Sequence, residues 1–126
     1  MRIDVALNDV ETGQFDVLPP ANYEVEVIAW KQDKSEAGPF IRWTLKPIGD
    51  LPKGNFGNLF LRTWLHAEAL WNLKRFLEAL QFEWDEDGFD PEEVVGCTCE
   101  VQVTNNTDEN TKRVYANVEP NYLPLT

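Results

Sequence analysis

The sequence predicts a single, mostly β domain with five strands and one α-helix between the third strand and the fourth. Apolar and polar residues alternate in five short segments, which is the period of a half-buried strand. One longer segment, 67–80, repeats its apolar residues at helical spacing instead. The length of 126 residues suits one domain with its own hydrophobic core.

Three strands are expected before the helix, over 21–32, 40–47 and 58–65. Each has aliphatic residues at every second position, so one side of each strand is expected to face the core. A lead-in segment, 1–20, precedes them and ends at Pro19-Pro20, which interrupts any regular element.

The helix is expected over 67–80, because this segment is rich in good helix formers and places its apolar residues on one face. Two further strands are expected after it, over 97–104 and 112–119. The apolar stripe of the helix consists of Leu70, Leu73, Phe76, Leu77 and Leu80.

This order of elements is that of the five-stranded oligonucleotide/oligosaccharide-binding (OB) barrel. We therefore expect residues 1–126 to form one OB-type barrel, with the helix closing one of its ends. The sequence contains no internal repeat.

Charge is distributed unevenly along the chain. The net charge is −11, which disfavours contact with phosphates. The segment 31–75 nevertheless has eight basic and four acidic residues, whereas 83–100 has eight acidic residues and no basic one. Within that acidic stretch the connector 83–96 is expected to contain a short helical turn that Asp90 caps and Pro91 opens. A local positive field can attract a polyanion that the total charge would repel.

Aromatic and basic residues interleave on one side of strands two and three. Proteins that bind single-stranded nucleic acid use cations to follow the phosphates and aromatic rings to stack on the bases. This side is therefore the candidate nucleic-acid site, unless the helix, the lead-in segment or a second subunit covers it. The candidate residues are Phe40, Arg42, Lys46, Phe60, Arg62 and Trp64, extended by Trp30, Lys31, Arg113 and Tyr115.

No catalytic, cofactor or metal motif is visible. His66 is the only histidine, and no zinc quartet, phosphate loop or nucleophile elbow occurs. Cys97 and Cys99 are expected to be reduced thiols, as in a reducing cytosol. Because these motifs are missing, we expect a protein that is not an enzyme. Because neither a signal peptide nor a membrane-spanning run is present, we expect it to be cytoplasmic.

Four stretches resemble phage proteins of the family catalogued as domain of unknown function 669, whose members are often labelled single-stranded DNA-binding. The resemblance implies an OB fold that binds single-stranded DNA in phage replication or recombination, with replication or recombination proteins as further partners and a homo-oligomer as an option. The stretches are FDVLPPANYEVEV at 15–27, FIRWTL at 40–45, ALWNLKRFLEAL at 69–80, and VYANV with YLP within 114–124.

Two features depart from the family. His66-Ala67 stands where the family usually has Thr-Pro before the helix. The chain ends Leu-Pro-Leu-Thr instead of in an acidic tail with a terminal aromatic residue, so no tail-mediated partner is implied. An acidic protein-interaction module and a structural phage protein are the alternative functions.

Overall fold

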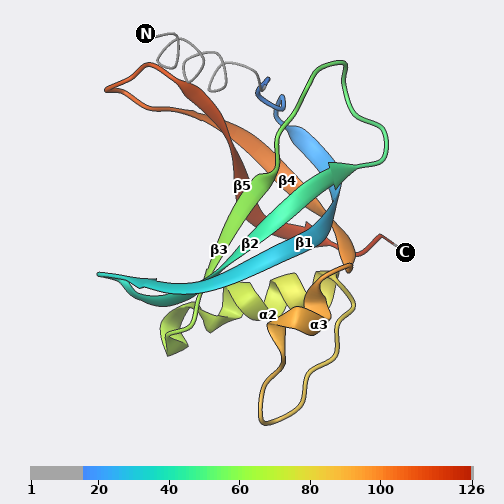
Figure 1. Cartoon of the computed structure of the whole chain (residues 1–126), viewed down its shortest axis with the longest axis vertical. Helices are drawn as coiled ribbons and strands as arrows, with labels where there is room; N and C mark the ends of the chain where they lie inside the picture. The colour runs from blue at the N-terminus through green and yellow to red at the C-terminus, as the bar shows by residue number, and fades with distance from the viewer. Residues whose placement is uncertain (1–15, 126) are drawn as a thin grey trace, which may run out of the picture.

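The computed structural model describes residues 16–125 and contains five antiparallel strands in one sheet (Figure 1). A 3-10 turn (Ala67–Ala69), helix α2 (Leu70–Ala79) and the short helix α3 (Pro91–Val94) lie between the third strand and the fourth. The mostly β prediction, with its helix in this position, is confirmed. Most of the lead-in segment, residues 1–15, lies outside the described residues. The strands are β1 (Ala21–Ser35), β2 (Gly38–Ile48), β3 (Leu59–Trp64), β4 (Thr98–Thr107) and β5 (Val114–Leu123).

The sheet has the order β3-β2-β1-β4-β5, and the long strand β1 joins its two halves. The first residues of β1 pair with β4, whereas most of the strand, as far as Ser35, pairs with β2. The expected closure into a barrel is not present, because no hydrogen-bonded ladder joins β3 to β5 within residues 16–125. The two outer strands therefore end the sheet as open edges.

A β-bulge at Ile28 changes which side of β1 faces the core. The register passes from Val27 opposite Leu45 to Ala29 opposite Thr44, so β1 contains one extra residue. One extra residue exchanges the two sides of everything that follows it. Up to Val27 the odd-numbered residues of β1 face inward, and after the bulge they face outward.

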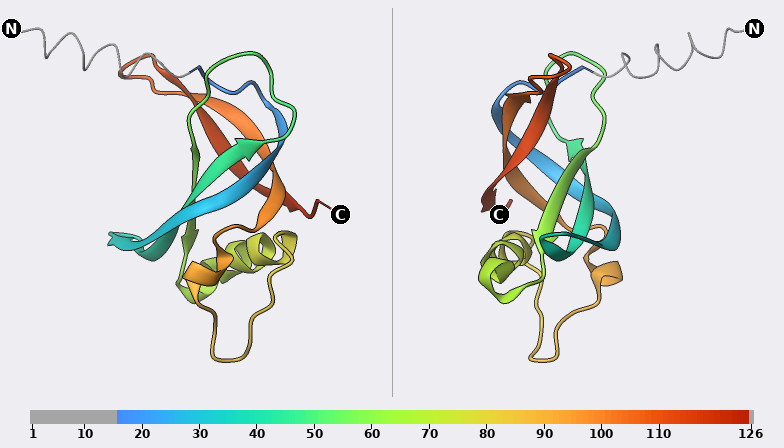
Figure 2. Two further views of the ribbon diagram at one scale, coloured as in Figure 1. Left: turned by 45° about the vertical axis from the view of Figure 1, so that its right-hand side comes forward. Right: turned by 90° about the vertical axis from the view of Figure 1, so that its left-hand side faces the viewer.

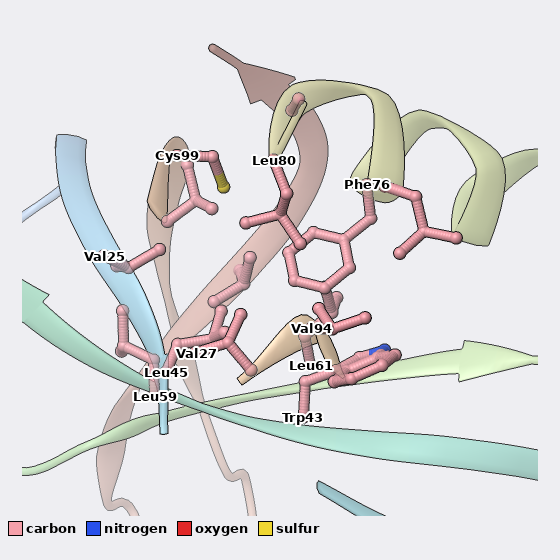
Figure 3. Packing of buried hydrophobic residues seen from close by; sticks show 14 of the residues in the cluster. Val25, Val27, Trp43, Leu45, Leu59, Leu61, Phe76, Leu80, Val94 and Cys99 are labelled. Carbon is pink, nitrogen blue, oxygen red and sulfur yellow. The ribbon is translucent and has the colours of Figure 1, made fainter. Parts of the chain in front are cut away.

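The core lies between the curved sheet and α2 (Figure 3). Trp43 is fully buried, as predicted, with its ring centroid 5.6 Å from that of Phe76 on α2. Its indole N–H donates to Thr63 Oγ1 at 2.9 Å, so the buried polar groups of both residues are paired. The predicted helix stripe is buried except for Leu70, which is 42% exposed because it begins the helix beyond the edge of the core.

The acidic connector follows α2 and returns to the sheet through α3 (Figure 2). Asp90 Oδ1 accepts from the backbone N–H of Glu92 at 3.0 Å and Pro91 opens the turn, as predicted. No helix within residues 16–125 is long and apolar enough to cross a membrane.

Candidate nucleic-acid interface

The outer face is the side of β1, β2 and β3 that points away from the core. Residues that sit opposite each other in the two ladders form rows across it, because cross-strand partners lie on the same side of a sheet. Three successive rows carry the interleaved aromatic and basic residues. They are Asp33–Phe40–Trp64, Lys31–Arg42–Arg62 and Ala29–Thr44–Phe60.

The middle row of the outer face consists of three cations. Arg42 of β2 is the direct ladder partner of both Lys31 of β1 and Arg62 of β3. The Lys31 ammonium lies 4.0 Å from the Asp33 carboxylate, in an exposed pair that is weakly held. Among residues 16–125, no carboxylate lies within 4 Å of either guanidinium. Like charges opposite each other destabilise a sheet, so this row favours an external anion.

Both arginines lie on aromatic rings of the neighbouring strand. The guanidinium carbon of Arg62 is 4.8 Å from the centroid of Phe40, and that of Arg42 is 5.3 Å from the centroid of Phe60. Each contact runs diagonally between β2 and β3 and is a cation–π pair. The rings hold the two charged groups close to the sheet, where they form a positively charged surface.

Phe40 supports this surface from beneath and is not available for stacking. Only 6% of it is exposed, and its ring centroid is 4.9 Å from that of Trp64. Its prediction as a base-stacking residue is therefore wrong, because Arg62 and Trp64 cover it. Trp64 itself is half-buried, with the His66 ring 6.3 Å from it. His66, the only histidine of the sequence, extends this aromatic cluster.

A hollow of about 660 Å³ lies between the open edges of β3 and β5. Phe60, which is 55% exposed, lines it from β3, and Tyr115, which is 49% exposed, lines it from β5. Phe56 and Leu18 also line it. Phe56 is not among the predicted site residues, because the Gly-rich loop around it has no periodic pattern.

The comparisons with known proteins give a family. A family model described as "Protein of unknown function (DUF669)" matches residues 3–124. The chain belongs to the DUF669 family. No curated protein matches this chain.

Trp30, Arg113 and Lys46, which are also predicted site residues of this DUF669 protein, lie away from the cationic row. Trp30 points to the other side of the sheet, opposite Trp43, and its indole N–H donates to the Glu92 carboxylate at 2.8 Å. Its prediction as part of the site is wrong, because the bulge at Ile28 turns it inward. Arg113 lies in the turn before β5 and does not line the hollow.

Lys46 is exposed at the far end of β2, where it faces Glu26 of β1. Next to that pair, Glu24 of β1 faces Glu100 of β4. The negative charges of these two strands bound the positive surface on one side. The basic part of the outer face in this DUF669 chain is therefore confined to β2, β3 and the distal half of β1.

The two long hairpins flank the outer face. Figure 1 shows the tips of the β1–β2 and β4–β5 hairpins projecting to the same side, with β3 between them. The left view in Figure 2 also shows the two tips projecting to the same side. The Lys31–Arg42–Arg62 row of the DUF669 chain crosses the β1–β2 arm and continues onto β3.

Among residues 16–125, no three His, Cys, Asp or Glu side chains come together as metal ligands. Cys97 and Cys99 are free thiols, as the sequence predicted. Burial, with smaller contributions from Cys97 and Glu100, raises the pKa of Cys99 to about 12. A thiol in this state is a poor nucleophile at neutral pH.

Proposed function

We propose that the outer face binds single-stranded DNA with little sequence specificity, in phage DNA replication or recombination inside the host cytoplasm. The observation that carries the proposal is the row Lys31–Arg42–Arg62, which has one weak carboxylate contact. The exposed ring of Phe60 and the half-buried ring of Trp64 lie beside it. A phosphate chain would supply the missing negative charge, and unpaired bases would supply ring faces for stacking.

The strand order supports the proposal by analogy. An OB barrel is partly open and binds oligonucleotides on the face of its second and third strands. We propose that this sheet is an OB-type barrel in which the β3–β5 pairing is absent. The resemblance to phage single-strand binders points the same way, and membership in the DUF669 family is compatible with it.

The geometry suggests how the nucleic acid would lie. Phosphates would follow the cationic row across β1, β2 and β3, with Trp64 in the neighbouring row on β3. One base would enter the hollow between Phe60 and Tyr115. Stacking contacts of this kind are worth about 1–3 kcal/mol per base.

The proposal is tested by fluorescence anisotropy with a labelled oligo-dT strand at two salt concentrations. Neutralising three cations predicts a slope of log K against log salt of about −2 for single strands. Arg42→Gln and Arg62→Gln should each weaken binding and make this slope shallower. Arg75→Gln is the matched control, because Arg75 lies on α2 and contacts Trp71 instead of the outer face.

Two results would contradict the proposal. One is the absence of binding to oligo-dT at low salt. The other is binding that Arg42→Gln, Arg62→Gln and Arg75→Gln weaken equally, since that would reflect total charge alone. A duplex of the same length serves as competitor, and the proposal requires that it compete poorly.

A further inference from the structure

A second hollow, the α2–loop groove, lies on the opposite side of the sheet from the outer face. It has a volume of about 470 Å³ and is formed between α2 and the connector that follows it. Its apolar walls come from both segments, with Trp71 on α2 and Trp84 on the connector. The residues that form these walls are Leu70, Trp71, Leu77, Trp84 and Phe89.

The apolar residues at the mouth of this groove are unusually exposed. Trp71 is 51% exposed, Trp84 is 40% exposed, and Leu70 adjoins them at the start of α2. Two tryptophans and a leucine around one hollow form an apolar surface of the kind that marks protein-binding sites. Tryptophan is also enriched among the residues that dominate binding energy at such sites.

Contacts within the protein itself fix the shape of the groove. The Phe89 ring lies 6.4 Å from Trp43 in the core and 6.1 Å from Phe82. Asp85 and Gly88 exchange two backbone hydrogen bonds, which fix the turn of the connector. A preformed site loses less entropy when a partner binds, so its apolar area contributes more to affinity.

The charge around the groove selects the class of partner. Asp85 and Glu86 line it, and the segment 83–93 carries seven acidic residues and no basic one. Lys74 of α2 is the single basic residue in the lining. This negative field would repel phosphates, so the groove is unsuited to nucleic acid. It would attract a segment that combines apolar anchors with Lys or Arg.

We propose that the α2–loop groove binds a basic amphipathic helix of another protein. Leu, Ile or Phe side chains at positions i, i+3 or i+4 and i+7 of that helix would fill the space between Trp71 and Trp84. Its Lys and Arg residues would face Asp85, Glu86 and the rest of the connector. The outer face lies across the sheet, so the helix and a DNA strand can be bound together.

The test uses a labelled peptide of about 16 residues, with leucines on one helical face and lysines on the other. Its affinity is measured by fluorescence anisotropy against the full chain. A peptide of the same composition with its leucines scrambled over all faces is the first control. A peptide with glutamate in place of lysine is the second. The amphipathic basic peptide should bind at least tenfold more tightly than either control.

Variants of the protein locate the site. Trp71→Ala and Trp84→Ala should each weaken peptide binding by about thirtyfold, since hot-spot truncations cost about 2 kcal/mol. Asp85→Asn combined with Glu86→Gln should weaken it and reduce its salt dependence, without removing an apolar contact. Leu123→Ala is the matched control, because Leu123 is an equally exposed apolar residue on β5.

Three results would overturn this inference, whether or not the chain binds DNA. The first is equal affinity for the amphipathic and scrambled peptides. The second is an affinity that neither tryptophan variant changes. The third is a dimer, seen by light scattering, that Trp71→Ala or Trp84→Ala dissociates, because the groove would then hold a second copy of this chain. Oligo-dT that displaces the peptide would contradict the placement of the two sites.

Discussion

Arg42 faces Arg62 directly across the β2–β3 ladder, and each guanidinium lies on a phenylalanine ring of the other strand. The rings of Phe40 and Phe60 keep both charges in place despite their mutual repulsion. The pair is thus arranged for an external anion at some cost to the stability of the sheet.

The repulsion between Arg42 and Arg62 is measurable by a double-mutant cycle. Urea denaturation gives the free energy of unfolding of Arg42→Gln, of Arg62→Gln and of the double variant. The cycle cancels the cation–π contact that each single variant loses, so that the interaction between the two arginines remains. The coupling free energy should be unfavourable by about 0.2–1 kcal/mol and should shrink as salt is added. A zero or favourable coupling would contradict the repulsive arrangement.

Phe60 and Phe40 should respond in opposite ways to truncation. Phe60→Ala should reduce oligo-dT affinity by about 1–3 kcal/mol but change the free energy of unfolding by less than about 0.5 kcal/mol, since its ring is exposed. Phe40→Ala should cost about 3 kcal/mol of unfolding free energy, because its ring is buried beneath Arg62 and Trp64. Anisotropy measures the affinity, and urea denaturation measures the stability. If Phe60→Ala lost as much stability as Phe40→Ala, the assignment of Phe60 to binding and of Phe40 to packing would be wrong.

Thr63→Val should destabilise the protein although it changes the side-chain volume little. The Trp43 indole N–H donates to Thr63 Oγ1 inside the core, and valine would leave that donor without a partner. An unsatisfied buried donor costs about 1–3 kcal/mol. Thr44→Val is the control, because Thr44 is only half-buried on the outer face. Equal urea midpoints for the two variants would argue against a stabilising role for the buried hydrogen bond.

Stability should fall in alkaline solution, partly because of Cys99. Burial raises the pKa of this thiol from 9.0 to about 12, so the folded state favours the neutral form. The stabilisation is complete below the unfolded-state pKa and is lost as the pH rises from about 9 towards about 12. Cys99→Ala should flatten part of this decline in urea denaturation. Burial also raises the pKa of Tyr122, so part of the alkaline loss of stability should persist in Cys99→Ala. An unchanged pH profile in Cys99→Ala would refute the contribution of the thiol.

The periodicity of the sequence predicted the strands, the helix and the burial of Trp43, because each depends on local alternation. Trp30 and Lys31 are both predicted to extend the site from the end of the first strand, although alternation places consecutive residues on opposite sides of a strand. The structure puts Lys31 on the outer face and Trp30 on the other side. The bulge at Ile28 is the reason, since no residue type there reveals an extra position in the strand. Counting from Val25 alone therefore assigns Trp30 to the wrong side.

The remaining differences come from contacts between segments far apart in the chain. Alternation correctly put Phe40 beside Arg62 and Trp64 on one side of the sheet, but it does not show that these neighbours bury the ring. The hollow next to Phe56 needs β5 to lie near β3. The groove between Trp71 and Trp84 needs the connector to fold back along α2. Such arrangements depend on tertiary packing, which the period of a single segment does not encode.

The missing ladder between β3 and β5 has a mechanical consequence for the hollow that they border. In a fully closed barrel, spreading two neighbouring strands breaks backbone hydrogen bonds at each step. Here the spacing between Phe60 and Tyr115 can widen without breaking any ladder bond among the described residues. The seam is therefore easily deformed. Under the proposed function, a small hinge of the sheet would let the same hollow take a one-ring pyrimidine or a two-ring purine.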